Sequence, residues 1–388
     1  MTSLHLAVAL DGAGWHPAAW READARPAEL LSARYWTDLA AEAEAGLLDF
    51  VTFEDSLGLQ PGGPGRVQGR LDAVLIAARV APLTRHVGLI PTVIVTHTEP
   101  FHISKAIATL DYVSTGRAGV RVRVSASQDD AALIGRRSLP DLADRNDPAV
   151  QQVVADLFGE AADYVEVVRR LWDSWEDDAE IRDVATGRFV DRGKLHYIDF
   201  EGQWFSVKGP SITPRPPQGQ PVVAALAHRS EPFRLVGKSA DVGFVTPRDA
   251  AQAAAIVAEI RAAQAEAGRA QQTVHVFGDL LVYLDADPAS AAARRDRLDQ
   301  SAGRQYGSDA LSFTGTPAQL ADLLQEWHAA GLTGFRLRPA AIPHDLTQVT
   351  RGLVPELQRR GAFRTHYESS TLRGLLGLPR PANRYATV

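Results

Sequence analysis

The sequence predicts an α/β fold, a (β/α)₈ barrel. Short apolar runs alternate with longer amphipathic runs along most of the 388 residues, which is typical of a parallel sheet with helices packed on it. An eighth strand and its helix lie near the end of the chain with no second hydrophobic unit after them. That position favours a closed barrel over an open, doubly wound sheet of similar strand count.

Each element is predicted from its local pattern. The short apolar runs predicted to be strands are 4–10, 48–53, 86–96, 119–124, 221–226, 242–245, part of 274–284, and 334–337. The amphipathic, Ala-rich runs predicted to be helices are 28–45, 67–81, 101–113, 147–173, 249–266, 317–329 and 346–360. A polar, aromatic insertion over 174–219 and an Arg-rich tail over 362–388 complete what we expect to be a single domain, 1–388.

Composition excludes several classes of protein. A net charge of −6 argues against a nucleic-acid binder, which normally has a basic face. No apolar run reaches the roughly 18 residues of a membrane span, and the N-terminus lacks the pattern of a secretion signal. The absence of cysteine removes disulfides and thiolate metal sites. We therefore expect a cytoplasmic protein that contacts neither membrane nor nucleic acid.

Common catalytic motifs are missing. The glycines that follow the first strand, Gly12 and Gly14, are followed by Pro17 where a dinucleotide fingerprint requires its third glycine. No P-loop, G-x-S-x-G or H-E-x-x-H motif is present. His97 and His102 are five residues apart, a poor spacing for metal ligands. We expect no metal, and a hydrolase has little support.

In a barrel, chemistry is located at the C-terminal ends of the strands. This rule selects polar residues that directly follow strands as candidate functional residues. The alternative for each of them is that it is only a solvated loop residue or a helix cap. They are 11–16, Glu54, Asp55, Thr96, His97, Ser125, His228, Arg229, Ser230, Arg336 and Arg338.

Several ordered segments carry a family resemblance that covers nearly the whole chain. They are EPFH at 99–102 continuing to ATLDYVSTGRAG at 108–119, YVEVVRRLWDSWE at 164–176, GRFVD at 187–191, KLHY at 194–197, FSVKGP at 205–210, PRPPQG at 214–219, and VPELQRRG at 354–361 with Arg364 and Tyr367. The chain resembles the bacterial luciferase-like flavin monooxygenases, in the branch of nitrilotriacetate, dibenzothiophene-sulfone and long-chain alkane monooxygenases.

The resemblance implies a barrel whose insertion, 174–219, folds over the C-terminal mouth. It implies reduced FMN that a separate flavin reductase supplies, molecular oxygen as co-substrate, and a small organic substrate. A homodimer or homotetramer is also implied. The cofactor performs the difficult step, so the protein must exclude water and orient the reactants.

Departures from the family pattern affect the flavin site. The strand-five end, usually Q-A-G-S-S followed by a glycine, is here 225–232, which contains His228, Arg229 and Ser230 and lacks the Gln, both Gly positions and the paired Ser. Arg121 occupies the usual Asn position of strand four, and the H-D-x-R-Y segment appears as VADLF at 154–158. Three readings stay open: an FMN monooxygenase with a rebuilt phosphate site, a deazaflavin-dependent oxidoreductase, and a flavin-free barrel that binds a ligand.

Site residues follow from these positions. His16, in the loop that resembles the family's H-H-x-x-A-W-R, and His97 are the expected catalytic residues. The residues expected to bind the cofactor are Asp55, Thr96, Arg121, Arg123, Ser125, His228, Arg229 and Ser230.

Two arginines of strand four are the most unusual feature. Alternation places Arg121, Arg123 and Ser125 on one face, which the family resemblance identifies as the interior. An unpaired buried charge costs several kcal/mol, so we expect Glu54 to pair with at least one arginine. The other would face the cofactor or substrate as an anion clamp; the alternative is that both reach solvent.

Overall fold

The computed structural model describes residues 4–60, 65–144 and 146–386. In this part of the chain, eight parallel strands close into a barrel in the order β1-β2-β3-β4-β9-β10-β11-β13, because β10 pairs with β11 and β13 pairs with β1. They are β1 (His5–Leu10), β2 (Phe50–Phe53), β3 (Gly88–Ile94), β4 (Gly119–Arg123), β9 (Val222–Ala227), β10 (Val242–Val245), β11 (His275–Leu284) and β13 (Gly334–Pro339). The predicted (β/α)₈ barrel is confirmed.

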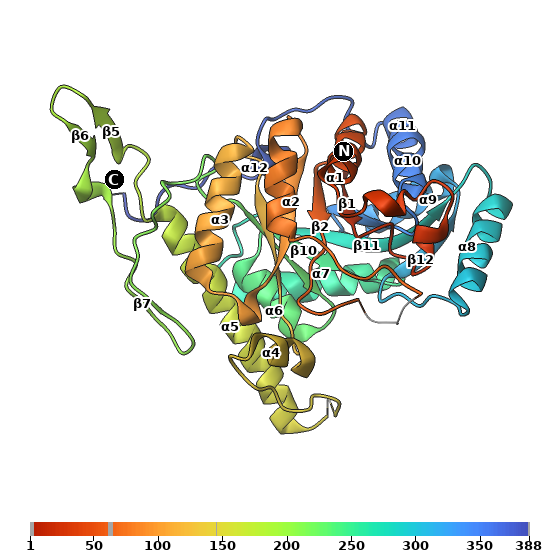
Figure 1. Cartoon of the computed structure of the whole chain (residues 1–388), viewed down its shortest axis with the longest axis horizontal. Coiled ribbons are helices and arrows are strands. Elements are labelled where there is room, and N and C mark those ends of the chain that lie inside the picture. Colours follow the sequence, from red (N-terminus) through yellow and green to blue (C-terminus); the bar gives the residue numbers. More distant parts are fainter. Residues whose placement is uncertain (1–3, 61–64, 145, 387–388) are drawn as a thin grey trace.

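Helices surround this barrel (Figure 1). They are α1 (Ala33–Ala45), α2 (Ala73–Val80), α3 (Pro100–Val113), α4 (Gln128–Ile134), α5 (Pro148–Asp173), α6 (Ser230–Ser239), α7 (Ala250–Glu266), α8 (Pro288–Ala302), α9 (Pro317–Ala329), α10 (His344–Gln348), α11 (Val354–Arg359) and α12 (Leu372–Leu375). Their starts follow local chemistry: Thr316 and Gln319 form a capping box before α9, with Pro317 in the first turn. None of the helices in the described ranges is long and apolar enough to cross a membrane.

The sequence analysis did not predict helices α4, α6, α8 and α12, the strands of the insertion, or the extra strand β12 (Leu311–Gly315), which pairs with the C-terminal half of β11. Helix α8 has clear end signals, since Asp287 caps its start and Gly303 ends it in a left-handed conformation. Its buried face is small: Ala291, Arg294, Leu298 and Asp299. A helix with so few large apolar residues produces a weak hydrophobic pattern.

The interior of the barrel changes character along its axis. Near the N-terminal ends of the strands, Phe50, Phe244 and Phe277 pack together, and Leu372 and Leu376 of the C-terminal tail join the same apolar cluster. The tail thus closes this end of the barrel. Nearer the C-terminal ends, the buried side chains are polar or charged, so the mouth is where chemistry is available.

The insertion reaches the mouth at one edge only. It contains two hairpins, β5 (Glu180–Asp183) with β6 (Arg188–Val190), and β7 (Phe200–Glu201) with β8 (Ser206–Val207). Residues 204–207 line a cavity together with 96–99, which follow β3. Hairpin β5–β6 projects away from the barrel (Figure 1). The expectation that the insertion covers the mouth therefore applies to its second hairpin alone.

Candidate active site

Glu54 and Arg121 form an ion pair inside the barrel near its mouth. Nη1 of Arg121 on β4 donates to Oε1 of Glu54 and, at 3.2 Å, to Oγ1 of Thr92. The two side chains are only 3% and 5% exposed. The predicted interior pair between Glu54 and an arginine of β4 is confirmed.

Further ion pairs extend from Glu54 around the mouth. Nη1 of Arg336 donates to the same Glu54 oxygen at 3.2 Å, and its Nε donates to Asp279 at 2.8 Å. Arg338 binds Asp279 at 2.9 Å through Nε and Asp309 at 2.6 Å through Nη1. We call this group the mouth ion network; its members are Arg121, Glu54, Arg336, Asp279, Arg338 and Asp309.

The network holds fixed charges at neutral pH. Burial alone would raise the pKa of Glu54, but the positive charges of Arg121 and Arg336 outweigh it and lower that pKa to about 2. Burial would likewise raise the pKa of Asp279, and the charges of Arg336 and Arg338 lower it instead. The carboxylates therefore stay ionised, and each buried arginine keeps an anionic partner.

Sequence reasoning selected Arg336 and Arg338 as strand-end candidates but missed their partners. Asp279 lies in the middle of the ten-residue strand β11, HVFGDLLVYL, and its side chain is fully buried. A single carboxylate in such an apolar run was the available signal, because buried charges require partners. Asp309 lies in the loop before β12, which no pattern marked.

His16 is buried, and both of its ring nitrogens have partners. Nδ1 accepts a hydrogen bond from the amide of Ala18 at 3.1 Å, so Nε2 carries the proton and donates to Asp299 at 3.1 Å. Burial lowers the pKa of His16. The loop can pass this close to Ala340 because residue 14 is a glycine. Its φ is +128°, and a side chain there would overlap the carbonyl of Ala340. His16 lies at the mouth, and its catalytic role stays a prediction.

His97 follows β3 and is only 8% exposed, yet neither ring nitrogen has a hydrogen-bond partner among the described residues. Burial lowers its pKa, and the charge of Arg137 lowers it further. The imidazole is therefore neutral at pH 7 and offers one donor and one acceptor. Its expected catalytic role is also untested.

Three expected cofactor residues shape the backbone at the mouth. Oγ1 of Thr96 accepts from the amide of Ser125 at 2.9 Å, and Oγ of Ser125 donates to Asp130 at 2.7 Å. The carboxylate of Asp55 accepts from the amide of Ala73 at 3.0 Å and so fixes the start of α2. These side chains join the ends of β2, β3 and β4.

Arg123 lies at the very end of β4 and is exposed, unlike Arg121 two residues earlier. Its Nη1 donates to the backbone carbonyl of Asp55 at 2.7 Å. With no ion pair among the described residues, Arg123 keeps an uncompensated charge at the rim. Its role as an anion clamp stays a prediction.

His228, Arg229 and Ser230 lie where β9 meets α6. Nε2 of His228 approaches Asp309 at 3.3 Å, and Nδ1 contacts the hydroxyl of Thr246 at 2.8 Å. Arg229 occupies the N-cap position of α6, and its side chain makes no capping hydrogen bond. The amides of the first turn thus receive no acceptor from the N-cap side chain, and such helix starts bind anions.

Two small cavities at the mouth share Asp11 and Gln60 among their linings. Each has a volume of about 150 Å³; one reaches Glu54, and the other is lined by His16 and Tyr306. Burial raises the pKa of Asp11. The mouth ion network therefore borders open space that a substrate can reach.

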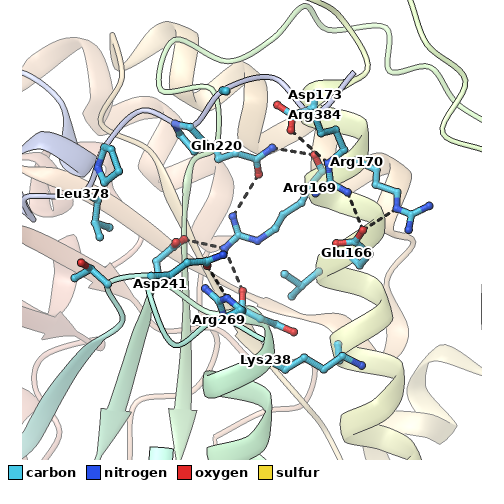
Figure 2. A pocket seen from close by; sticks show the side chains of 18 of the residues that line it. Glu166, Arg169, Arg170, Asp173, Gln220, Lys238, Asp241, Arg269, Leu378 and Arg384 are labelled. Atoms are coloured by element: carbon cyan, nitrogen blue, oxygen red, sulfur yellow. Dashed lines mark hydrogen bonds and ion pairs between the residues drawn. The ribbon is translucent and has the colours of Figure 1, made fainter. Parts of the chain in front are cut away.

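A larger cavity, about 870 Å³, lies at the opposite end of the barrel (Figure 2). Gln220, two residues before β9, and Asp241, directly before β10, line it. Arg169 binds Asp241 at 2.9 Å, and Arg384 binds Glu166 at 2.8 Å. Active sites of such barrels lie at the C-terminal face, so we assign no catalysis to this cavity. No group of side chains in the described ranges has the arrangement of a metal site.

Comparison with known proteins agrees with this geometry. The family model described as luciferase-like monooxygenase matches residues 13–334. N-acetyl-S-(2-succino)cysteine monooxygenase of Bacillus subtilis is 32% identical, over 99% of this chain and 98% of that protein. The chain belongs to the luciferase-like monooxygenase family. It is a flavin-dependent monooxygenase.

Other relatives of this luciferase-like monooxygenase have the same extent. Nitrilotriacetate monooxygenase component A of Aminobacter aminovorans is 29% identical, with 96% of both chains covered. The crystal structure of a long-chain alkane monooxygenase superposes with a TM-score of 0.85 at 22% identity, over 97% of this chain and 96% of that one. The latter comparison shows the fold alone.

Proposed function

We propose that this monooxygenase is the oxygenase component of a two-component system. A separate flavin reductase supplies reduced FMN, and molecular oxygen is inserted into a small organic substrate. The name of the Aminobacter relative, nitrilotriacetate monooxygenase component A, implies a further component for that protein, and by similarity we infer a transient reductase partner for this chain.

The start of α6 carries the assignment of FMN. A phosphate placed there meets the backbone amides of Ser230 and Glu231, since Pro232 has none, together with the positive end of the helix dipole and the neighbouring His228 and Arg229. The carboxylate of Glu231 in this turn is paired with Arg234. Arg suits a phosphate because it can donate two parallel hydrogen bonds. His228 and Arg229 stand where the family pattern has small residues. Burial lowers the pKa of His228, so the pair offers hydrogen-bond donors and the single positive charge of Arg229 to a phosphate-bearing cofactor.

The remaining mouth residues have separate tasks. Reduced FMN, when bound, supplies the electrons that activate oxygen. The hydrogen bond from the amide of Ser125 to Thr96 fixes the rim of the mouth, where a flavin would bind. The mouth ion network presents fixed dipoles and charges that require no rearrangement during the reaction. His16, neutral and buried beside the cavity, can hold a proton at Nε2 close to the substrate.

FMN titration followed by fluorescence, under anaerobic reducing conditions, tests the phosphate position. His228→Ala and Arg229→Ala should each weaken FMN binding about tenfold, because charge-assisted hydrogen bonds contribute about 1.5–3 kcal/mol. Arg85→Ala is the control, since this exposed arginine precedes β3 at the opposite end of the barrel. Equal affinity in all three variants would contradict the phosphate position.

Oxygen uptake coupled to a flavin reductase tests the activity itself. We expect uptake that depends on reductase, FMN and an organic substrate together. Absence of substrate-dependent uptake, with FMN bound, would contradict the oxygenase assignment. We further propose that the enzyme acts in the cytoplasm. We also propose that it is a homodimer or homotetramer, and sedimentation of the purified protein measures this oligomeric state directly.

A further inference from the structure

The cavity of about 870 Å³ at the end of the barrel opposite the mouth has a positively charged lining (Figure 2). It lies among α5, α6, the segment after α7 and the C-terminal tail. Its six cationic side chains are Arg169, Arg170, Lys238, Arg269, Arg373 and Arg384. The four anionic ones among the described residues are Asp163, Glu166, Asp173 and Asp241. Six cations against four anions leave two positive charges in excess.

The excess positive charge is concentrated around Asp241. Nη2 of Arg169 binds this carboxylate at 2.9 Å, and Nη1 of Arg373 lies 3.6 Å from it. Arg269 donates to two backbone carbonyls at 2.9 and 3.0 Å and has no ion pair with a described residue. Burial lowers the pKa of Arg269, and the charge of Arg169 lowers it further. Three arginines therefore share one carboxylate, and they repel one another.

Several hydrogen-bond donors of this lining are free to bind a ligand. Nε of Arg169, Nη2 of Arg373 and Nζ of Lys238 have no acceptor in the described part of the chain. The hydroxyl of Ser239, a residue only 8% exposed, has no partner there either. All four atoms belong to residues that line the cavity, and none of them is sealed off by surrounding atoms. An anion in the cavity can therefore accept hydrogen bonds from them.

The origin of these donors selects the kind of anion. Arg169 belongs to α5, Lys238 and Ser239 to α6, and Arg373 to α12, so the donors come from three separate helices. A carboxylate presents its two oxygens in one plane and carries one charge. A phosphate directs its oxygens tetrahedrally and carries up to two charges on one group. Two excess positive charges and donors from several directions therefore fit a phosphate dianion.

We propose that this cavity binds a phosphate dianion, either free or as the phosphate group of a small molecule, and that the anion ties the C-terminal tail to α5 and α6. Arg373 lies on α12, and Leu372 and Leu376 beside it close this end of the barrel. The volume leaves room for an organic body next to the phosphate.

This site is separate from the flavin position at the mouth. Helix α6 begins at Ser230 and ends at Ser239, so the two positions lie at opposite ends of one helix, roughly 14 Å apart. Binding in the cavity requires neither flavin nor reductase.

Calorimetric titration of the flavin-free protein with inorganic phosphate, at low ionic strength and pH 8, tests the site. We expect binding to the parent protein, and its absence would overturn the proposal. Lys238→Ala and Ser239→Ala should each weaken binding about fivefold or more, because each removes a donor to a charged ligand. Neither side chain has a hydrogen bond to the described residues, so both variants should keep the fold. Parent-like affinity in both variants would overturn the site.

Two controls locate the phosphate. Lys194→Ala removes the same charge from the insertion, where Lys194 pairs with Asp178 outside the cavity, and its phosphate affinity should equal the parent's. Arg229→Ala should also bind phosphate as the parent does, because Arg229 lies at the mouth. A loss of affinity in Arg229→Ala without a loss in Lys238→Ala would place the phosphate at the mouth and overturn the cavity.

Two further ligands test the chemical class and the source of the phosphate. Malonate, with two carboxylates, should bind at least tenfold more weakly than phosphate, and equal binding would overturn the choice of phosphate. Adenosine monophosphate distinguishes the sources: tighter binding than inorganic phosphate identifies a phosphate ester as the occupant, and weaker or equal binding identifies the free anion.

Hydrogen exchange tests the link to the tail. Saturating phosphate should slow the exchange of backbone amides over 372–378, because a ligand that binds only the docked tail stabilises it against local opening. The same amides in Ser239→Ala, at the same phosphate concentration, should be protected less. Exchange in the tail that does not respond to bound phosphate would refute this link.

Discussion

A single oxygen of Glu54, Oε1, accepts hydrogen bonds from both Arg121 on β4 and Arg336 on β13. One carboxylate, directly after β2, therefore joins β4 and β13, and neither of these strands pairs with β2. Charged side chains thus meet inside the barrel at a height along its axis where most such barrels have packed apolar layers. This arrangement makes the mouth depend on Glu54 both for stability and for its electrostatic character.

Glu54→Gln should destabilise the protein by about 3–5 kcal/mol, the range measured when one member of a buried ion pair is removed. Two arginines would then share a neutral amide that cannot balance their charge. Chemical denaturation followed by circular dichroism measures the change. Glu356→Gln is the control, because this glutamate pairs with Arg359 and Arg360 on the surface, where such pairs contribute little. Similar losses in both variants would refute the special position of Glu54.

Acid should destabilise the protein partly through Glu54. Its pKa is lowered from 4.5 to about 2 in the folded protein, so the folded state binds the proton less readily than the unfolded state. The resulting stability is present above the unfolded pKa and is lost as the pH falls toward the folded pKa. We expect the denaturant concentration at the unfolding midpoint to decrease as the pH is lowered from about 4.5 to 2. The decrease should be smaller in Glu54→Gln. Identical pH dependence in both proteins would contradict this pKa.

His16→Ala should lower turnover about tenfold or more while the fold is kept, because the loop from Asp11 would lose its attachment to Asp299. Asp299→Ala should produce a similar loss, and the double variant should be no worse than either single one, as expected for coupled residues. Reductase-coupled oxygen uptake measures turnover, and circular dichroism checks the fold. Additive losses would show that the two residues act independently.

The sequence could predict the barrel because each strand repeated the same signal, a short apolar run that ended in polar residues. It predicted that Glu54 pairs with Arg121 or Arg123 for a related reason: alternation in β4 placed both charges inside, and buried charge requires a partner. The structure buries Arg121 and pairs it with Glu54, and it leaves Arg123 exposed. Helix α8 lacked such a signal, since Arg294 and Asp299 occupy part of its buried face.

The candidate site was only partly predictable, because most of its contacts join distant segments. His16 was selected from its loop, but its partner Asp299 lies 283 residues later. Asp309 meets both Arg338 and His228 from a loop with no motif. Nothing in a local pattern specifies which loop closes on which strand end, and this depends on how the whole barrel packs. Strand-end position selected His16, Arg338 and His228, and the structure supplied their partners Asp299 and Asp309.

Arg123→Met should weaken binding of anionic ligands at the mouth while leaving stability nearly unchanged. Arg123 is exposed and makes its hydrogen bond to a backbone carbonyl, that of Asp55, so its removal leaves no buried charge unpaired. Arg121→Met should behave oppositely and destabilise the fold, since Glu54 would retain Arg336 alone. Denaturation midpoints and FMN affinities of the two variants separate these effects. If both variants bound FMN and substrate as tightly as the parent, the anion clamp would be refuted, and the arginines would serve the architecture of the mouth only.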